Sequence, residues 1–217
     1  MAQHVLLLIS SVYEKINLQD HSIHPLFGDG ATATYVAGEE TETPFLHSFV
    51  FGTDGSRYDK LYIPVGGSRH MPRENPEVFE TDERGNTRSN YEVYMDGTAI
   101  TYFTLREVPT LVDQVLDKAG LERKDLDYCV FHQANKFMLE YVRKKCGLMD
   151  VSFHNDIEKI GNTVSGTSPF GLEAVLQQQE PQELRHVLLA GFGVGLSWAG
   201  CMADLTRVMG SAESSVP

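Results

Sequence analysis

Residues 126–142, LDYCVFHQANKFMLEYV, predict a strand followed directly by a helix. Residues 126–131 form a mostly apolar run that is typical of a buried strand. Apolar residues then recur at helical spacing until Gly147, which is a suitable end for a helix. The residues at this spacing are Phe137, Met138, Tyr141 and Val142. His132 is therefore expected at the carboxyl end of a strand.

The sequence on the N-terminal side predicts a longer helix. Apolar residues recur at helical spacing from Leu105 to Ala119, and Gly120 supplies a plausible C-cap. Strands that alternate with helices in this way favour a layered α/β architecture with a mostly parallel sheet.

On the C-terminal side, residues 151–153 predict a short strand. Residues 162–168, NTVSGTS, form a polar loop of small residues, which places Asn162 on a loop. Pro169 then predicts the start of another helix, with Ser168 as its N-cap.

Strands are also predicted near both ends of the chain. Residues 186–190 and 196–205 predict two antiparallel strands, joined by the glycine-rich turn at residues 191–195. Residues 5–10 form a continuous apolar run of the kind found in a central parallel strand covered by helices. Residues 31–36 predict another strand after a tight turn.

Glycines mark two further features of the first 94 residues. Gly28 and Gly30 precede the second strand and predict close packing of the backbone there. From Gly38 to about Arg88 the sequence is rich in Gly, Pro and charged residues. We expect this stretch to be a long connection that packs over a site or at a subunit contact.

Composition and charge exclude several classes of protein. The net charge of -12 argues against general affinity for nucleic acid, since phosphate binding needs an excess of Lys and Arg. The longest apolar run near the start, residues 5–9, is too short to cross a bilayer, and no signal cleavage site follows it. We therefore expect a cytoplasmic protein that does not bind membranes. Its three cysteines are too few for a disulfide framework.

Four motifs occur in register with one family. They are FHQAN at residues 131–135, GNT at residues 161–163, LAGFGVGLSW at residues 189–198 and FGDGA at residues 27–31. Together with TLREVP at residues 104–109, they make the chain resemble 3-oxoacyl-[acyl-carrier-protein] synthase III, also called ketoacyl synthase III. The resemblance runs from about Val5 to about Leu205.

The resemblance implies a thiolase-like fold, in which two similar halves form five alternating layers of helices and sheets (α-β-α-β-α). Residues 1–38 match the end of the first half, and residues 95–207 match the complete second half. Residues 39–94 are then connecting loops or a lid, and residues 208–217 a flexible tail. We therefore expect an incomplete thiolase-like α/β fold.

The family catalyses decarboxylative Claisen condensation of an acyl thioester with malonyl carrier protein, using a Cys, a His and an Asn. The resemblance assigns the second and third roles to His132 and Asn162. Two fixed N–H donors there would stabilise the negative charge that develops on the thioester oxygen. The resemblance implies no cofactor, with acyl-CoA and malonyl acyl-carrier protein as substrates.

Two groups of residues carry further roles by resemblance. The turn containing Phe192, Gly193, Val194 and Gly195 resembles the segment that forms the oxyanion hole for the acyl group, with the backbone N–H of Val194 as donor and Phe192 beside the acyl pocket. The basic residues proposed to receive an acidic acyl-carrier protein are Lys136, Arg143, Lys144 and Lys145. Phe137 departs from the pattern, because the family often has Arg at that position.

The nucleophilic cysteine is the main departure from the family. In the family it lies on a helix before the strand that matches residues 5–10, and none of Cys129, Cys146 and Cys201 occupies that position. We expect a split-gene product, a truncated gene or one half of a two-chain enzyme, which is inactive alone. Its partner would be a cysteine-bearing front-half chain or a second copy. A rival hypothesis is a non-catalytic binding or stabilising subunit.

Each motif also has a simpler interpretation. A single His at a strand end is often structural, and a single Asn is often a turn residue. The glycine-rich turn at residues 191–195 lacks the GxGxxG spacing of a dinucleotide site. His21 and His24 have no partner at metal-ligand spacing, and the basic cluster after Asn135 also fits a solvated helix face.

Overall fold

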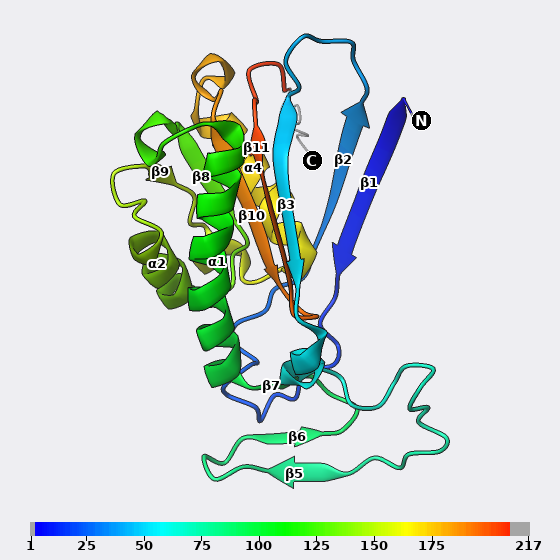
Figure 1. Ribbon diagram of the computed structural model, residues 1–217. Helices are drawn as coiled ribbons and strands as arrows, with labels where there is room; N and C mark the ends of the chain where they lie inside the picture. The colour runs from blue at the N-terminus through cyan, green and yellow to red at the C-terminus, as the bar shows by residue number, and fades with distance from the viewer. Residues whose placement is uncertain (1–2, 209–217) are drawn as a thin grey trace.

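The structure, a computed structural model, describes residues 3–208 and is built around a mixed five-stranded sheet (Figure 1). The strand order is β3-β11-β10-β8-β9. The strands are β3 (Leu46–Thr53), β8 (Tyr128–Phe131), β9 (Ser152–Phe153), β10 (Val187–Gly193) and β11 (Ser197–Ala203). The β8–β10 and β8–β9 pairs are parallel, whereas the β10–β11 and β11–β3 pairs are antiparallel. The expectation of a mostly parallel sheet is therefore wrong.

Helices cover both faces of this sheet (Figure 1). The helices α1 (Gly97–Ala119) and α2 (Lys136–Lys145) pack on one face, and α4 (Thr167–Gln178) packs on the other. Successive side chains of β8 alternate between the two cores, with Cys129 and Phe131 facing α1 and Val130 facing α4. Each large apolar side chain buried there stabilises the fold by about 1.5–3 kcal/mol.

The caps of α1 explain where this helix begins and ends. The Asp96 side chain accepts a hydrogen bond of 2.9 Å from the backbone N–H of Ala99. At the other end, Gly120 has a φ of 68° and closes the helix in the left-handed conformation that glycine tolerates best. The predicted C-cap is confirmed, and the helix starts earlier than the apolar pattern from Leu105 indicated.

The last helix, α4, begins differently from the prediction. Its first residue is Thr167, so Ser168 lies inside the first turn and is not the N-cap. Pro169 is the third residue of the helix. Proline is tolerated there because the first backbone N–H groups of a helix have no partner within it.

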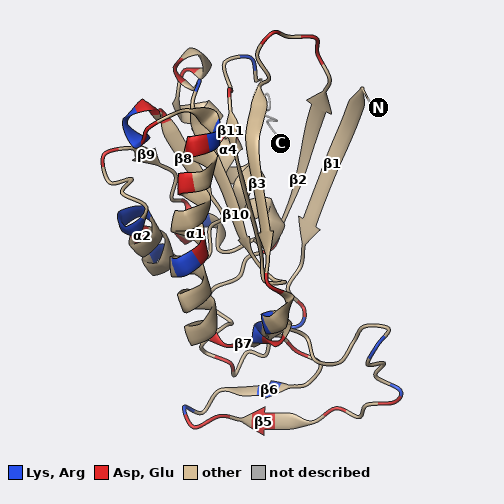
Figure 2. Cartoon of the chain, viewed as in Figure 1, with Lys and Arg blue, Asp and Glu red and all other residues tan. Residues whose placement is uncertain are grey.

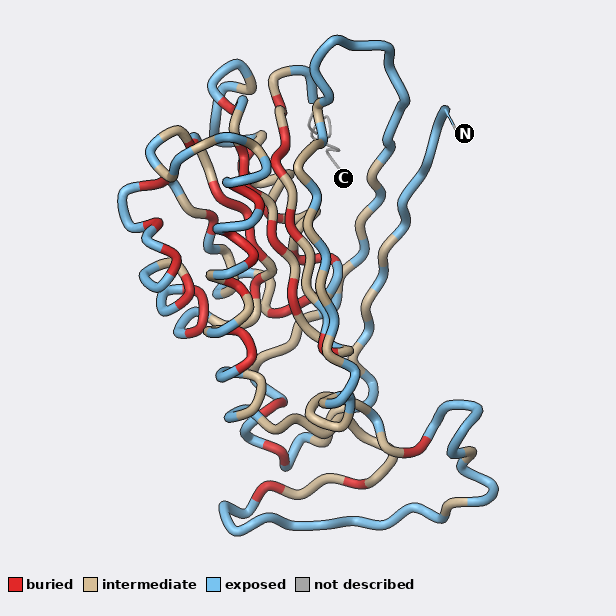
Figure 3. The backbone as a smooth tube through the Cα atoms, viewed as in Figure 1, coloured by how far each residue is buried: buried red, intermediate tan, exposed pale blue. Residues whose placement is uncertain are grey.

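The first two strands form a separate two-stranded ribbon. Strands β1 (His4–Ser11) and β2 (Gly30–Ala37) pair antiparallel to each other, and they lie apart from the main sheet in Figure 1. Most of the ribbon is exposed (Figure 3), including Leu6 at 60% and Leu8 at 68%. Residues 5–10 do form a strand, but it is not a central parallel strand covered by helices.

The predicted connection between residues 38 and 88 contains more regular structure than expected. It includes β3, which is an edge strand of the main sheet. A Cβ atom at Gly52 would lie 2.1 Å from the ring of Trp198, so glycine is needed where β3 passes Trp198 on β11. Short strands follow: β4 (Leu61–Tyr62), β5 (Phe79–Thr81), β6 (Thr87–Ser89) and β7 (Tyr94–Met95).

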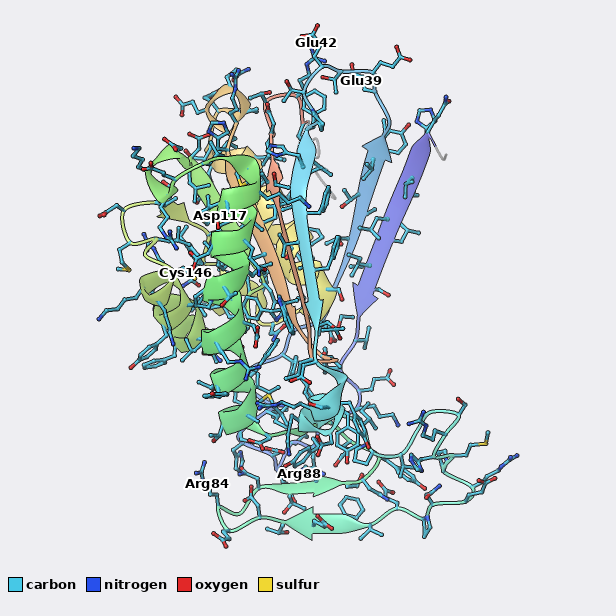
Figure 4. All side chains as sticks on the ribbon, in the orientation of Figure 1. Glu39, Glu42, Arg84, Arg88, Asp117 and Cys146 are labelled. Atoms are coloured by element: carbon cyan, nitrogen blue, oxygen red, sulfur yellow. The ribbon has the colours of Figure 1, made fainter. Side chains whose placement is uncertain are left out.

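The β5–β6 hairpin extends away from the sheet at the bottom of Figure 1. It is fixed to the connection between β1 and β2 by an ion pair of 3.0 Å between Arg88, labelled in Figure 4, and the buried carboxylate of Asp20. The division of the chain at residues 38, 94 and 207 stays a prediction. Residues 209–217 of the predicted tail lie outside the described residues. Among residues 3–208, none of the helices has the length and apolar character of a membrane-spanning segment.

Candidate active site

A cavity of about 1030 Å³ lies at the carboxyl ends of β8 and β10. Five of the six predicted catalytic and oxyanion residues line it: His132, Asn162, Phe192, Gly193 and Val194. The sixth, Gly195, lies in the same turn but does not line the cavity. The fold therefore brings two widely separated polar side chains, His132 and Asn162, into one cavity.

His132 follows the last residue of β8, and three contacts fix it. Its backbone N–H donates to the carbonyl of Ala190 on β10 over 2.8 Å, which continues the parallel pairing by one residue. Its Nδ1 atom lies 2.7 Å from Oγ1 of Thr167. Its ring meets the ring of Phe192 edge-on, with centroids 5.4 Å apart.

Burial changes the chemistry of this imidazole. Removal from water lowers the pKa of His132 from 6.5 to about 4, and a backbone hydrogen bond with Val164 opposes the shift. The ring is therefore neutral at pH 7. A neutral imidazole carries one N–H, so it presents either a donor or an acceptor to the cavity.

Asn162 is positioned by close packing of two backbone segments. Its backbone N–H donates to Leu26 over 2.8 Å, and its carbonyl accepts from Gly28 over 3.1 Å. A Cβ atom at Gly28 would lie 2.0 Å from the carbonyl oxygen of Ile160. The predicted close backbone packing at Gly28 is thus confirmed, and it holds the loop that carries Asn162.

The side chain of Asn162 is oriented by the backbone around it. Its Oδ1 atom accepts from the N–H of Val164 over 2.9 Å, and its Nδ2 atom lies 3.4 Å from the carbonyl oxygen of Ala134. Nδ2 carries two hydrogens. With Oδ1 occupied, Asn162 has an amide hydrogen left to offer to a ligand in the cavity.

The turn between β10 and β11 closes one side of the cavity. Phe192 is buried, whereas the side chain of Val194 is 59% exposed. The turn is held to the end of β3 by two backbone hydrogen bonds between Leu196 and Asp54, of 2.8 and 3.1 Å. The assignment of the Val194 N–H as an oxyanion donor stays a prediction.

The remaining wall of the cavity is mostly apolar and comes from residues to which the sequence analysis gave no individual role, although residues 38–88 were expected to pack over a site or at a subunit contact. These residues include Val12, Tyr13, Phe51, Ile63, Val93, Met95, Ile100 and Trp198. Apart from Trp198, which ends the motif at residues 189–198, no local motif marks them, because they converge only when β1, β3, β7 and α1 are packed together. The chemistry of this wall suits an apolar chain with a polar end near His132 and Asn162.

None of the three cysteines lines this cavity. Cys129 is on β8, Cys201 is on β11, and Cys146, labelled in Figure 4, is packed in the core that contains α1 and α2. Burial raises the pKa of Cys129 and of Cys146 to about 12, and that of Cys201 to about 11. All three are therefore protonated at pH 7, and a protonated thiol is a poor nucleophile.

The four basic residues predicted to receive a carrier protein differ in their contacts. Lys136 pairs with Glu158 over 2.6 Å. The Arg143 guanidinium donates to the carbonyls of residues 148, 149 and 151, so it holds the turn after α2. Lys144 and Lys145 are exposed and contribute to the positive charge on α2 in Figure 2.

Comparisons with known proteins match both ends of the chain. The family model described as 3-oxoacyl-[acyl-carrier-protein] synthase III C terminal matches residues 116–205, and the model described as 3-oxoacyl-[acyl-carrier-protein] synthase III matches residues 1–55. The chain is 31% identical over 208 residues to beta-ketoacyl-[acyl-carrier-protein] synthase III of Caldanaerobacter subterraneus subsp. tengcongensis, covering 95% of this chain and 60% of that relative. It is 31% identical over 192 residues to the same synthase of Streptococcus equi subsp. zooepidemicus, covering 88% of this chain and 55% of that relative.

Solved structures agree with these relatives. A crystal structure of 3-oxoacyl-(acyl-carrier-protein) synthase III matches with a TM-score of 0.88 and 39% identity, covering 94% of this chain and 60% of that chain. The 3-oxoacyl-(acyl-carrier protein) synthase of Burkholderia xenovorans LB400 matches with a TM-score of 0.82 and 34% identity, covering 94% and 56%. The chain thus spans at most 60% of the length of these proteins.

Proposed function

Because the chain belongs to the 3-oxoacyl-[acyl-carrier-protein] synthase III family of condensing enzymes, we propose that its cavity stabilises the charged intermediate of a decarboxylative Claisen condensation. The substrates would be an acyl thioester, delivered by CoA or a carrier protein, and a malonyl thioester on acyl-carrier protein. The observation that carries this proposal is that His132 and Asn162, 30 residues apart in the sequence, line one largely apolar cavity.

The chemistry requires donors near the malonyl thioester oxygen. When the carbon–carbon bond to the carboxylate breaks, carbon dioxide leaves and its electron pair forms an enolate, whose charge resides largely on that oxygen. The amide of Asn162 and the ring of His132 would each donate one N–H to it. The enolate carbon then attacks the acyl thioester carbonyl, a new carbon–carbon bond forms, and the sulfur departs. Loss of one such donor typically costs about a hundredfold or more in rate.

None of the three cysteines of this sequence suits the role of the sulfur that carries the acyl group. Cys129, Cys146 and Cys201 are protonated at neutral pH, and none of them lines the cavity. We therefore propose that a cysteine-bearing polypeptide completes the site. The exposed apolar ribbon formed by β1 and β2 supports this proposal, since large exposed apolar surfaces mark sites of protein contact. A second copy of the chain is another candidate for covering the ribbon.

An acyl-carrier protein is the proposed donor of the malonyl group. Asn135 and Met138, at the start of α2, line the cavity, and Lys144 and Lys145 are exposed near the end of the same helix. These two lysines would attract an acidic carrier by long-range steering. Arg143 is bonded to three carbonyls, so it is better suited to a structural role.

The test is an assay of the purified chain with acetyl-CoA and malonyl carrier protein, with and without cysteine-bearing front-half proteins. We expect condensation only in the reconstituted complex, and Asn162→Ala should reduce it about a hundredfold. Asn155→Ala serves as a control, because that residue is exposed and does not line the cavity. Condensation by the chain alone would refute the need for an external thiol.

A non-catalytic binding or stabilising subunit is the alternative, and the absence of a cysteine among the residues that line the cavity favours it. His132→Ala separates the two functions. If a reconstituted complex turns over at the normal rate with this substitution, the binding function is correct and the catalytic proposal fails.

A further inference from the structure

Thr167 contacts the imidazole of His132 from inside the protein. It is the first residue of α4 and is fully buried, and its Oγ1 atom lies 2.7 Å from Nδ1 of His132. His132 lines the cavity, and its other ring nitrogen, Nε2, is the one that does not face Thr167. A neutral imidazole carries one proton, which is either on the nitrogen that faces Thr167 or on the other nitrogen.

The hydroxyl of Thr167 has one proton and two neighbouring acceptors. One is Nδ1 of His132, and the other is the carbonyl oxygen of Val164, at 2.8 Å. That carbonyl already accepts the backbone N–H of Thr167. The hydroxyl proton can therefore go to Nδ1 without leaving the buried carbonyl unsatisfied. An unprotonated imidazole nitrogen is also a more basic acceptor than an amide carbonyl, and both acceptors lie within hydrogen-bond distance of the hydroxyl.

We propose that Thr167 is a positioning residue: its hydroxyl donates to Nδ1 of His132 and so keeps the imidazole proton on Nε2, where it is available to the cavity. This inference deepens the proposed function and rests on it, because a charge-stabilising His132 has to donate from Nε2. With the opposite tautomer, Nε2 would present a lone pair to a developing negative oxygen.

The tautomer is measured directly by ¹⁵N nuclear magnetic resonance of imidazole-labelled chain at pH 7, without substrate. The sequence has eight histidines, so His132→Gln identifies the signals of His132 by their loss. We expect a protonated Nε2 and an unprotonated Nδ1 in the wild-type chain and in Thr167→Ser. In Thr167→Val the ratio of Nε2–H to Nδ1–H should fall about fivefold, the size of effect that one net hydrogen bond supplies.

Two results would overturn the proposal: a protonated Nδ1 in the wild-type chain, or an unchanged tautomer ratio in folded Thr167→Val. If that variant fails to fold, Thr167→Ala provides the same test with a smaller side chain, and the wild-type spectrum remains decisive by itself. The backbone amide spectrum reports folding of each variant.

The tautomer measurement separates this inference from the proposed function. A protonated Nε2 in a chain that supports no condensation with any front-half protein would refute the function and leave the role of Thr167 intact. In an active reconstituted enzyme, Thr167→Val should lower kcat about fivefold with KM unchanged, and Thr167→Ser should restore it. An unchanged kcat in spite of a shifted tautomer would contradict the link between Thr167 and catalysis.

Discussion

At the scale of single residues, the site depends on glycines as much as on polar side chains. Asn162 is placed by backbone hydrogen bonds with Leu26 and Gly28, and these require the two segments to approach more closely than a side chain allows. His132 is placed by its strand, by Thr167 and by the ring of Phe192. The polar groups would do the chemistry, but small residues decide where those groups lie.

Gly28→Ala should therefore destabilise the chain and displace Asn162. The added methyl group would lie 2.0 Å from the carbonyl oxygen of Ile160, and overpacking against rigid backbone typically costs about 1–3 kcal/mol. Urea denaturation measures the change in the free energy of unfolding. Gly67→Ala is the matched control, because a Cβ atom there meets nothing within 4 Å. Equal stability of the two variants would show that the backbone contact is not tight.

The lowered pKa of His132 predicts a pH dependence of stability. The folded-state pKa of about 4 lies below the ordinary value of 6.5, so the unfolded chain binds more protons between these two values. Stability is fully present above pH 6.5 and is lost as the pH falls towards 4, by up to about 3 kcal/mol. Urea midpoints of wild type and His132→Gln at pH 7 and pH 5 check this. The prediction would be contradicted if the urea midpoint of the wild type fell between pH 7 and pH 5 by no more than that of His132→Gln.

At the scale of elements, the site depends on which strand ends lie side by side, more than on the order of the strands along the chain. The parallel strands β8 and β10 end side by side, and the hydrogen bond between His132 and Ala190 extends their pairing into the site. The helices on the two faces then act as supports. Helix α1 contributes Ile100, Thr101 and Thr104 to the cavity wall, so the way this helix begins affects the site.

Asp96→Ala should weaken that beginning of α1. The carboxylate caps the helix through the N–H of Ala99, and loss of such a cap costs about 0.5–2 kcal/mol. Asp117, labelled in Figure 4, is an exposed residue in the last turn of the same helix. Asp117→Ala should be neutral or slightly stabilising, because it removes a negative charge near the helix C-terminus. Thermal unfolding of both variants compares the two ends, and an equal effect at both would rule out the cap.

At the scale of the whole molecule, burial is unevenly distributed (Figure 3). The main sheet has a continuous core on both faces, whereas the β1–β2 ribbon exposes Leu6, Leu8 and Tyr35 to solvent. A two-stranded ribbon is marginally stable by itself in water. The pairing of β1 with β2 is complete over eight residue pairs.

The same burial predicts slow reaction of the chain's thiols. Because the pKa values of Cys129, Cys146 and Cys201 are raised to about 12, 12 and 11, each thiolate is scarce at pH 8. A colourimetric disulfide reagent should label the native chain far more slowly than the urea-unfolded chain. Rapid labelling of one cysteine in the native chain would indicate a reactive thiol and revive it as a nucleophile.

The sequence by itself determined those elements that depend on neighbouring residues only. The helix that Gly120 ends, the strand before His132 and the hairpin around residues 191–195 follow from apolar periodicity and turn residues, and the structure confirms them. Strand β3 was missed because its residues lie in a glycine- and proline-rich stretch, and its place beside β11 depends on Trp198, almost 150 residues further along the chain.

Only the tertiary structure decided what the elements enclose. The motifs named His132 and Asn162, but their convergence depends on contacts between segments far apart, such as Gly28 against Ile160 and Thr167 against His132. The apolar run at residues 5–10 specified a strand without specifying its surroundings, because an apolar side chain favours burial without saying against what. Periodicity is encoded within a few neighbouring residues, whereas packing across the fold is set by distances that no short stretch of sequence contains.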